Sequence, residues 1–216
     1  MSRRIKSDNF KTMYPIKSEE QLKDCYEWLR FQIHKAKSNI KKYQAERNYM
    51  VFHIGVNTAF RAEDLLQLRV KDLITGYIHI KENKTGKLQR FPIQKHLYKD
   101  ICDYIEKYNL TNNDYMFQGQ TKKHTYDGTE RDIIKAITKQ YYLRVMKKLA
   151  KGVGIRFPLG IHSLRKTFGY HYYKKHKHLI TLAKMLNHSD YNVTLRYIMW
   201  DTDEIEKVRN DFYIDY

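Results

Sequence analysis

The sequence predicts a mainly α-helical domain with a small antiparallel β-sheet, made of one β-hairpin or three short strands. Only 9 of the 216 residues are Gly and 3 are Pro, so residues that break helices are few. Apolar side chains recur at helical spacing through most of the chain, whereas residues 77–93 alternate with the period of a strand. With 42% hydrophobic residues, the chain can bury one substantial core.

The N-terminal part is expected to contain two helices. Residues 1–17 are basic and should be mostly irregular. Ser18 followed by Gln21 matches the capping-box pattern that begins a helix, and the apolar spacing behind it predicts a helix over 19–37. A second helix is predicted over 41–57, where apolar residues on more than one side indicate burial.

A turn and a β-hairpin are predicted next. Residues 57–68 should form a turn followed by a short helix, with Arg61 at the start of that helix. Residues 77–80 and 89–93 alternate as short strands, and between them lies the polar segment Asn83-Lys84-Thr85-Gly86. A tight polar turn with a glycine predicts a hairpin, whose lysine-rich tip offers a mobile cation.

The middle of the chain is expected to hold two helices separated by a loop. A helix over 95–108 follows the hairpin, and residues 109–131 are predicted to be a long loop. An amphipathic helix over 138–151 should end at Gly152, because glycine readily adopts the conformation that closes a helix C-terminus.

The segment Gly160-Ile-His-Ser-Leu-Arg-Lys-Thr-Phe-Gly169 is predicted to open another helix, capped by Ser163. His162 and Arg165 lie three residues apart, so they share one helix face. A helix N-terminus attracts anions, and a guanidinium beside an imidazole could hold a phosphate and move a proton. Taken alone, this fragment is better explained as a capped surface helix that carries a histidine and an arginine.

The C-terminal part is predicted to be helical. A helix over 179–187 ends before His188, a short turn or helix over 191–199 contains Tyr197, and a start signal precedes a terminal helix over 203–212. No Gly/Ser linker divides the chain, so we expect one domain.

The charge of the chain predicts a polyanionic partner. Lys and Arg number 41 against 24 Asp and Glu, a formal net charge of +17, and nucleic acid is the usual partner for such an excess. A membrane surface is the competing explanation, but the basic residues are not concentrated on one amphipathic helix. No apolar run suits a signal peptide or a membrane span. Cys25 and Cys102 match no metal or redox spacing, so a reducing cytoplasm is expected.

Four places along the chain could carry chemistry. They are Arg61 at a helix start, a lysine at the hairpin tip, the pair His162 and Arg165, and His188 nine residues before Tyr197. Each is ordinary by itself, because short patterns of this kind match by chance in many proteins. What distinguishes this chain is that all of them occur in one order.

Together these places resemble the tyrosine recombinases, the phage integrase family. The resemblance covers about residues 20–200. It implies the catalytic-domain fold of that family over 18–200, after a basic lead-in over 1–17, and a C-terminal tail helix over 201–216. The segments that carry it are Thr58-Ala-Phe-Arg61-Ala-Glu-Asp64, Lys81-Glu-Asn-Lys84-Thr-Gly-Lys87, His162-Ser-Leu-Arg165 and Leu186-Asn-His188 followed by Tyr197.

The resemblance implies site-specific DNA recombination, in which strands are cut and rejoined through a covalent 3′-phosphotyrosine, leading to integration, excision or inversion. Tyr197 would be the nucleophile. Arg61 and Arg165 would stabilise the charge on the phosphate and ease the loss of the tyrosine proton, and His188 would donate a hydrogen bond. The family needs neither a metal nor a nucleotide cofactor.

The remaining site residues are assigned less directly. Lys84 would protonate the departing 5′-oxygen, with Lys81 and Lys87 as near alternatives. His162 would be the base or the proton relay. Asp64 would orient neighbouring groups, and a plain helix pair with Arg61 is the alternative.

Double-stranded DNA is the expected partner. Contacts with its backbone would make binding sensitive to salt. The tail is expected to dock on a neighbouring protomer and support a tetramer on DNA, or else to fold back on its own domain. Larger family members carry a core-binding domain ahead of the catalytic domain, and the first motif here starts near residue 58, so a catalytic domain alone is expected. The residues expected to contact the backbone are Arg69, Lys87, Lys122, Lys123 and Lys166.

Three other functions could account for a basic chain of this kind. A type IB topoisomerase has the same arginines, histidine and tyrosine, but such enzymes typically hold a lysine where this chain has His162. A non-catalytic DNA-binding regulator could keep the same fold. An RNA-binding module is disfavoured, because the sequence has neither a stacking-sheet signature nor a KH-type glycine loop.

Overall fold

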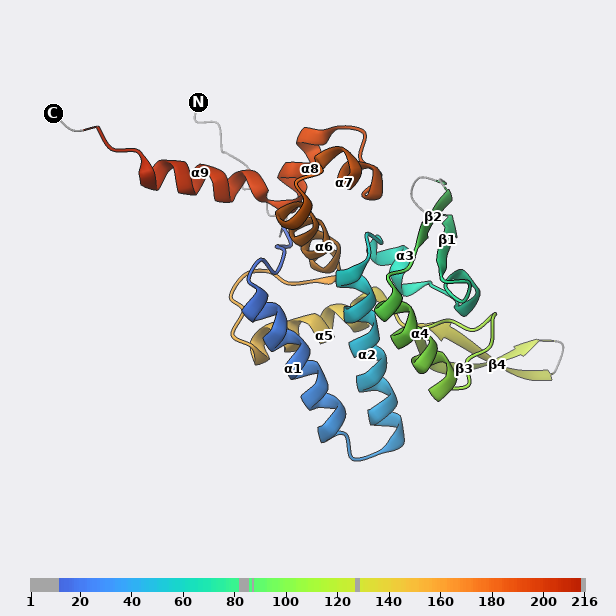
Figure 1. The fold of residues 1–216 in the computed structure, drawn as a ribbon. Coiled ribbons are helices and arrows are strands. Elements are labelled where there is room, and N and C mark those ends of the chain that lie inside the picture. Colours follow the sequence, from blue (N-terminus) through green and yellow to red (C-terminus); the bar gives the residue numbers. More distant parts are fainter. Residues whose placement is uncertain (1–11, 82–85, 87, 127–128, 215–216) are drawn as a thin grey trace, which may run out of the picture.

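The computed structural model describes residues 12–81, 86, 88–126 and 129–214 (Figure 1). It is mainly helical and contains two small antiparallel sheets of two strands each, which confirms the predicted fold class. The elements are α1 (Glu19–Lys35), α2 (Asn39–Asn57), α3 (Ala62–Leu66), the 3-10 helix η1 (Val70–Asp72), β1 (Tyr77–Lys81), β2 (Leu88–Pro92), α4 (Lys95–Lys107), β3 (Gln118–Tyr126), β4 (Thr129–Ala136), α5 (Lys139–Gly152), α6 (Ile161–His176), α7 (Leu179–Met185), α8 (Tyr191–Ile198) and α9 (Trp200–Asp211).

Helices α1 and α2 lie side by side and are joined by a short turn at one end of the molecule (Figure 1). The Ser18 hydroxyl accepts a hydrogen bond from the Gln21 N–H at 3.2 Å, so the predicted start of α1 is confirmed. The second helix begins two residues earlier than predicted, because Ser38 caps it by accepting from the Lys41 N–H. The predicted burial of this helix is also confirmed.

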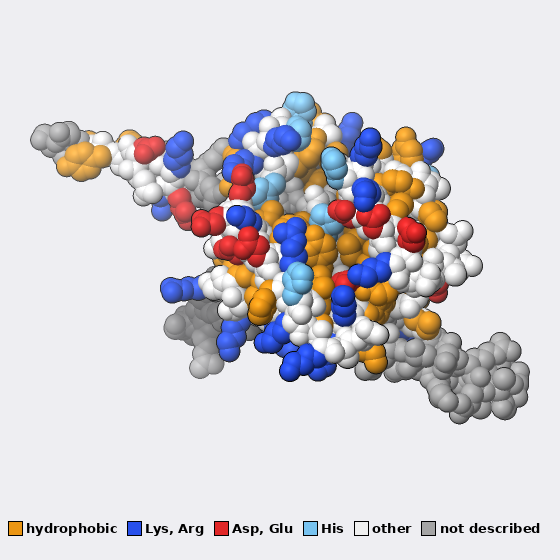
Figure 2. Space-filling model, turned by 60° about the horizontal axis from the view of Figure 1, so that its bottom comes forward, with side chains coloured by type: hydrophobic (Ala, Val, Ile, Leu, Met, Phe, Trp, Pro, Cys, Tyr) orange, Lys and Arg blue, Asp and Glu red, His pale blue; other side chains and the backbone are white. Residues whose placement is uncertain are grey.

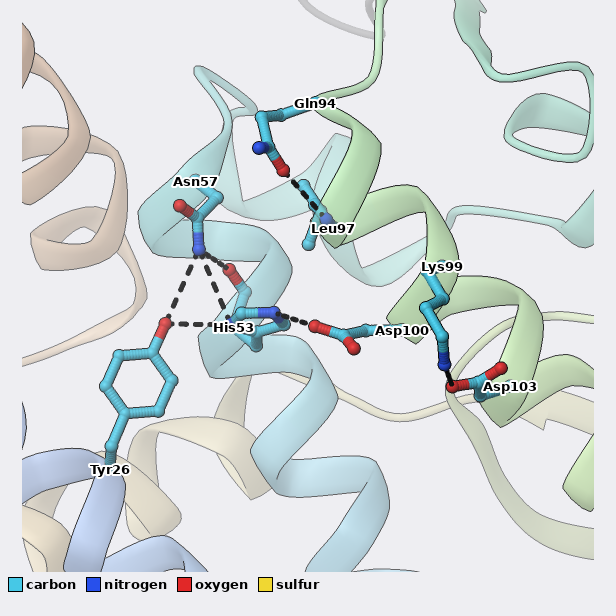
Figure 3. A network of polar contacts seen from close by, with 8 residues as sticks. All are labelled: Tyr26, His53, Asn57, Gln94, Leu97, Lys99, Asp100 and Asp103. Atoms are coloured by element: carbon cyan, nitrogen blue, oxygen red, sulfur yellow. Dashed lines mark hydrogen bonds and ion pairs between the residues drawn. The ribbon is translucent and has the colours of Figure 1, made fainter.

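A polar network fixes α1, α2 and α4 to one another (Figure 3). The Nδ1 atom of His53 lies 2.8 Å from the Tyr26 hydroxyl, and its Nε2 atom lies 3.0 Å from a carboxylate oxygen of Asp100. The side-chain amide of Asn57 donates to the His53 carbonyl at 2.8 Å. The network therefore reaches the end of α2, from which the chain continues toward Arg61.

Two hydrophobic clusters hold the molecule together. The larger one, which we call the main core, surrounds α2 and includes the fully buried side chains of Phe52 and Ile54. The smaller one, the small core, lies between α6, α7 and α8 and is made by the buried residues Ala59, Leu182, Leu186 and Ile198, with aromatic rings packed around them. Gly169 of α6 lets α8 approach, since a Cβ atom there would lie 2.7 Å from Ile198 Cγ2.

The prediction of a long loop over 109–131 is wrong. Strand β3 pairs antiparallel with β4, with Lys122 opposite Ile133, and the hairpin extends away from the helices (Figure 1). The described side chains of Ile134 and Lys135 in β4 are exposed, and the polar segment 118–132 shows no apolar alternation from which a strand could be predicted.

Two residues that were predicted to cap helices, Gly152 and Ser163, do not cap them. Gly152 is the last residue of α5 and does not cap it. The indole of Trp28 lies only 2.0 Å from where a Cβ of Gly152 would be, so this glycine permits a close approach of α1. Helix α6 starts from Gly160, and Ser163 lies inside its first turn, where its hydroxyl accepts from the Gly160 N–H at 3.1 Å.

The described end of the lead-in, residues 12–17, is irregular as predicted but is packed onto α6. Ile16 is fully buried, and its N–H donates to the Thr167 hydroxyl at 2.9 Å. At the other terminus, α9 projects from the body beyond Met199, which has φ of 60° (Figure 1). None of the helices in the described part of the chain is both long and apolar enough to cross a membrane.

Candidate active site

Arg165 joins three parts of the molecule. It lies in the second turn of α6 and is only 3% exposed. Its guanidinium donates one hydrogen bond to the carbonyl of Ala59, in the turn between α2 and α3, and another to the carbonyl of Leu186, at the end of α7. Arg61 follows the same α2–α3 turn and precedes the first residue of α3. The orientation of Arg165 is therefore fixed by main-chain atoms.

Tyr197 and His188 lie against each other beside these arginines. Tyr197 is in α8, and its ring meets the His188 ring edge to face, with centroids 5.0 Å apart and planes at 82°. His188 follows α7, after Asn187 has turned the chain with φ of 50°. The Nδ1 atom of His188 lies 3.0 Å from the hydroxyl of Thr194, which is fully buried in α8.

Opposing effects act on the Tyr197 hydroxyl. Burial raises its pKa above the usual value, while a hydrogen bond from Arg165 and the charges of Arg165 and Arg61 offset part of that rise. Both arginines are thus close enough to act on this oxygen. With its pKa raised, Tyr197 is protonated at neutral pH in the free protein.

Burial and the two arginines also act on His188. Loss of hydration, followed by the positive charges of Arg165 and Arg61, lowers the pKa of His188 to about 4. Its imidazole is therefore neutral near pH 7. One ring nitrogen is engaged by Thr194, which fixes the orientation of the ring.

His162 occupies the outer edge of this cluster, in the first turn of α6, and is exposed. Partial desolvation of its ring and the charges of Lys139 and Arg165 lower its pKa, while Glu63 acts in the opposite direction. Lys139 and Glu63 form an ion pair at 2.7 Å, which links the start of α5 to α3. A neutral imidazole at this edge can accept a proton.

Lys166 differs from what its sequence suggested. Its side chain is 8% exposed, and its ammonium lies 5.0 Å from the centre of the Tyr197 ring. It therefore contacts the candidate nucleophile and has little surface to offer to a DNA backbone. Arg69 is also engaged within the protein, because it donates to the Asn113 carbonyl and stacks 4.0 Å above the Tyr115 ring.

Other predicted residues lie at the margin of the cluster or cannot be placed. Asp64 is buried, at 6% exposure, in the first turn of α3. Lys84 and Lys87 lie outside the described residues. Lys122 and Lys123 belong to β3, and their side chains are outside the description. Among the residues that the structure does describe, no group of three or more His, Cys, Asp or Glu could hold a metal ion.

Some members of the cluster were not singled out from the sequence. Thr194 orients His188. It could have been found in the sequence as a short polar residue one helical turn before Tyr197. The carbonyls of Ala59 and Leu186 hold Arg165, but main-chain groups leave no trace in residue types. The structure thus brings two arginines and one histidine together beside Tyr197.

The model of the phage integrase family matches residues 29–204 of the chain, which includes every residue of this cluster. The chain belongs to the phage integrase family. Its similarity to curated relatives agrees. It is 31% identical over 190 residues to the probable integrase/recombinase YoeC of Bacillus subtilis, covering 88% of this chain and 91% of that protein.

Other integrase-family relatives are longer. A tyrosine recombinase of Pseudothermotoga lettingae is 24% identical over 155 residues, which is 71% of this chain and 49% of that protein. The chain therefore spans nearly all of YoeC but about half of this relative.

Solved structures show the same fold. The XerA recombinase superposes with a TM-score of 0.65 at 18% identity, over 94% of this chain and 66% of that one. The XerH recombinase bound to its palindromic difH substrate superposes with a TM-score of 0.64 at 24% identity, over 93% and 53%. The catalytic domain of the bacteriophage HP1 integrase gives 0.56 at 16% identity, over 86% of each chain. The integrase catalytic-domain fold thus accounts for nearly the whole chain.

Proposed function

We propose that this integrase-family protein is a site-specific DNA recombinase that cuts and rejoins strands through a covalent 3′-phosphotyrosine. The observation that carries the proposal is the gathering of three groups around Tyr197. Arg165 hydrogen-bonds its hydroxyl, the charge of Arg61 acts on the same oxygen, and the His188 ring lies against the tyrosine ring. Positive and hydrogen-bonding groups beside a tyrosine suit a phosphate under attack, since negative charge develops on its non-bridging oxygens. The DNA-bound recombinases among its structural neighbours support DNA as the substrate.

In the proposed reaction the Tyr197 oxygen attacks the phosphorus atom, and the bond from phosphorus to the 5′-oxygen breaks. The tyrosine proton passes to His162 or through it to water, and the leaving 5′-oxygen takes a proton from Lys84. Rejoining reverses these steps, so the phosphodiester energy is kept in the phosphotyrosine. The arginines stabilise the pentavalent state, and Asp64, buried in the turn of α3 that follows Arg61, helps to position that end of the site. We assign the chain no cofactor.

The proposed substrate is double-stranded DNA, with Lys87, Lys122 and Lys123 as contact residues. Lys166 and Arg69, which the sequence also suggested, are engaged in contacts within the protein. A tetramer on DNA, joined by the C-terminal tail, fits the projecting α9 and the exposed residues Phe212, Tyr213 and Ile214. The reaction would take place in the cytoplasm, where the protein meets DNA.

The test is trapping of the covalent intermediate. The protein is mixed with nicked duplexes that carry candidate sites, in the presence of a metal chelator, and a protein–DNA adduct that resists denaturant is sought. Tyr197→Phe should abolish the adduct. Tyr191→Phe, which alters an exposed tyrosine of the same helix, should retain it. An adduct formed by Tyr197→Phe would refute the assigned nucleophile, and relaxation of arbitrary supercoiled DNA would indicate a topoisomerase.

A further inference from the structure

A groove lined by cations runs between α2 and α5, away from the candidate active site. It consists of two adjoining cavities of about 680 Å³ and about 810 Å³, which share Gln44, Tyr141 and Arg144. We call it the α2–α5 groove. It starts near Thr138, next to the first residue of α5, and reaches the turn between α1 and α2. None of the residues that line it belongs to the Tyr197 cluster.

The charge of the groove has one sign. The first cavity is lined by Lys35, Lys37, Lys41, Arg144 and Lys148, all exposed, and the described lining of both cavities contains no Asp or Glu. None of these five cations takes part in the ion pairs found between described residues. Cations that face a common groove without carboxylates repel one another, so an anion bound there relieves that repulsion.

The N-terminus of α2 and a buried arginine add to the positive charge of the groove. Helix α2 begins at the groove and has no acidic residue in its first turn, whereas α1 has Glu19 and Glu20 there. The positive end of α2 therefore adds to the field of Lys37 and Lys41. In the second cavity, Arg47 is 3% exposed, and its Nε has no hydrogen-bond partner among the described residues. The guanidinium itself is covered, but its charge adds to the positive field of the second cavity.

The surface around the groove agrees with this assignment. Figure 2 views the molecule with the end that carries the α1–α2 turn brought forward, and acidic side chains lie mainly in the upper half of that view. Basic side chains lie both among them and below them, and few acidic ones accompany the basic side chains in the lower half. Tyr141 and Trp28 in the groove lining can pack against sugars while the lysines contact phosphates.

We propose that the α2–α5 groove binds the phosphate backbone of the DNA that flanks the cleavage site. This inference rests on the proposed function, from which it takes duplex DNA as the partner and Tyr197 as the point of cleavage. Helix α2 has 19 residues and is about 28 Å long, with the α2–α3 turn of the candidate active site at one end and the lysines of the groove at the other. We place the duplex along α2, so that at about 3.4 Å per base pair the groove lies about 8 base pairs from the scissile phosphate.

The first test compares two pairs of lysines. In one variant, Lys37→Gln and Lys41→Gln are combined. In the control, Lys95→Gln and Lys175→Gln remove two exposed lysines outside the groove. Binding to a long duplex is measured over a series of salt concentrations. The groove variant should lower the slope of log affinity against log salt by about 2 and weaken binding by about tenfold or more, while the control stays near the parent. Equal losses in both pairs, or no loss in either, would overturn the proposal.

The second test varies the DNA. Substrates extend on one side of the cleavage site at a time, from about 4 to about 16 base pairs, and the deficit of the groove variant should appear only beyond about 8. A deficit that is the same at every length contradicts a flank contact. At saturating DNA the groove variant should form the Tyr197 adduct within twofold of the parent rate. If no protein forms the adduct but the salt slope still falls, the proposed chemistry fails and the groove assignment stands.

Discussion

The main core and the small core hold different halves of the candidate active site. Arg61 follows the turn after α2, whose buried face is central to the main core, whereas Arg165 is held by carbonyls of two small-core residues, Ala59 and Leu186. Tyr197 packs against the four buried hydrophobic residues of the small core, and His188 lies against its ring. The two arginines are thus anchored in different cores, and the candidate nucleophile lies on an element packed against the smaller one. A tyrosine that must advance toward phosphorus and later retreat is best placed on such an element.

Arg165 is held by two carbonyls of the small core, so its loss should have the largest effect. Arg165→Ala leaves two buried carbonyls without donors, which should lower the free energy of unfolding by about 2–5 kcal/mol. It should also slow adduct formation by at least about 10³-fold. Denaturant unfolding and single-turnover trapping measure the two effects. Arg61→Ala is the comparison, expected to lose similar activity with a smaller loss of stability. Equal losses of stability would show that Arg61 and Arg165 contribute equally to the free energy of unfolding.

Truncating one isoleucine in each core should separate stability from activity. Ile54→Ala in the main core should cost about 2–5 kcal/mol of unfolding free energy. Ile198→Ala, next to the nucleophile in the small core, should cost less because α8 can collapse onto the gap, yet it should slow adduct formation about tenfold or more. Unfolding midpoints and trapping rates are compared at one temperature. The same change in unfolding midpoint and in trapping rate for both variants would mean that the two cores contribute equally to stability and to activity.

The protonation of His188 should make the small core sensitive to acid. Its folded pKa is about 4, below the ordinary 6.5, so the unfolded chain takes up the proton first. The stability it contributes is present above pH 6.5 and is lost as the pH falls toward 4. His188→Asn should flatten the stability profile between these pH values, and His34→Asn, an exposed site on α1, should leave it unchanged. A parent-like slope in His188→Asn would contradict this.

The smallest expected effect concerns the hydroxyl that orients His188. Thr194→Val keeps the shape of the side chain but removes its hydrogen bond to Nδ1, which should cost about 1 kcal/mol of stability and slow adduct formation several-fold. Thr194→Ser should restore most of the rate because it restores the hydroxyl. Failure of Ser to rescue the rate, measured by trapping, would indicate that packing of the methyl group matters more.

Much of the helical framework could be predicted from the sequence. Long amphipathic helices such as α1 and α4 are recognisable from the spacing of their apolar residues and from their N-cap residues. The hairpin of β3 and β4 could not, since the polar segment 118–132 lacks the apolar alternation by which a strand is recognised. Gly152 was misassigned because its role depends on Trp28, which lies more than a hundred residues earlier in the chain. A contact between such distant parts of the sequence cannot be inferred from local residue patterns.

The candidate site divides in the same way. Arg61, His162, Arg165, His188 and Tyr197 could be proposed from residue types in order, and the structure brings them into one region of the molecule. The burial of Lys166 could not be predicted, because its neighbours in the sequence give no sign that Tyr197 of α8 lies against it. The roles of these residues in catalysis stay predictions until the adduct is trapped.

The way in which Arg165 is held has a consequence for how such proteins can diverge. A main-chain carbonyl is the same in every amino acid, so positions 59 and 186 can change residue type without withdrawing the acceptors that aim the guanidinium. They are constrained by volume alone, since both side chains are packed in the small core. Substitutions at these two positions therefore reflect changes in side-chain packing. Two relatives that share neither residue can still present the arginine to DNA in the same orientation.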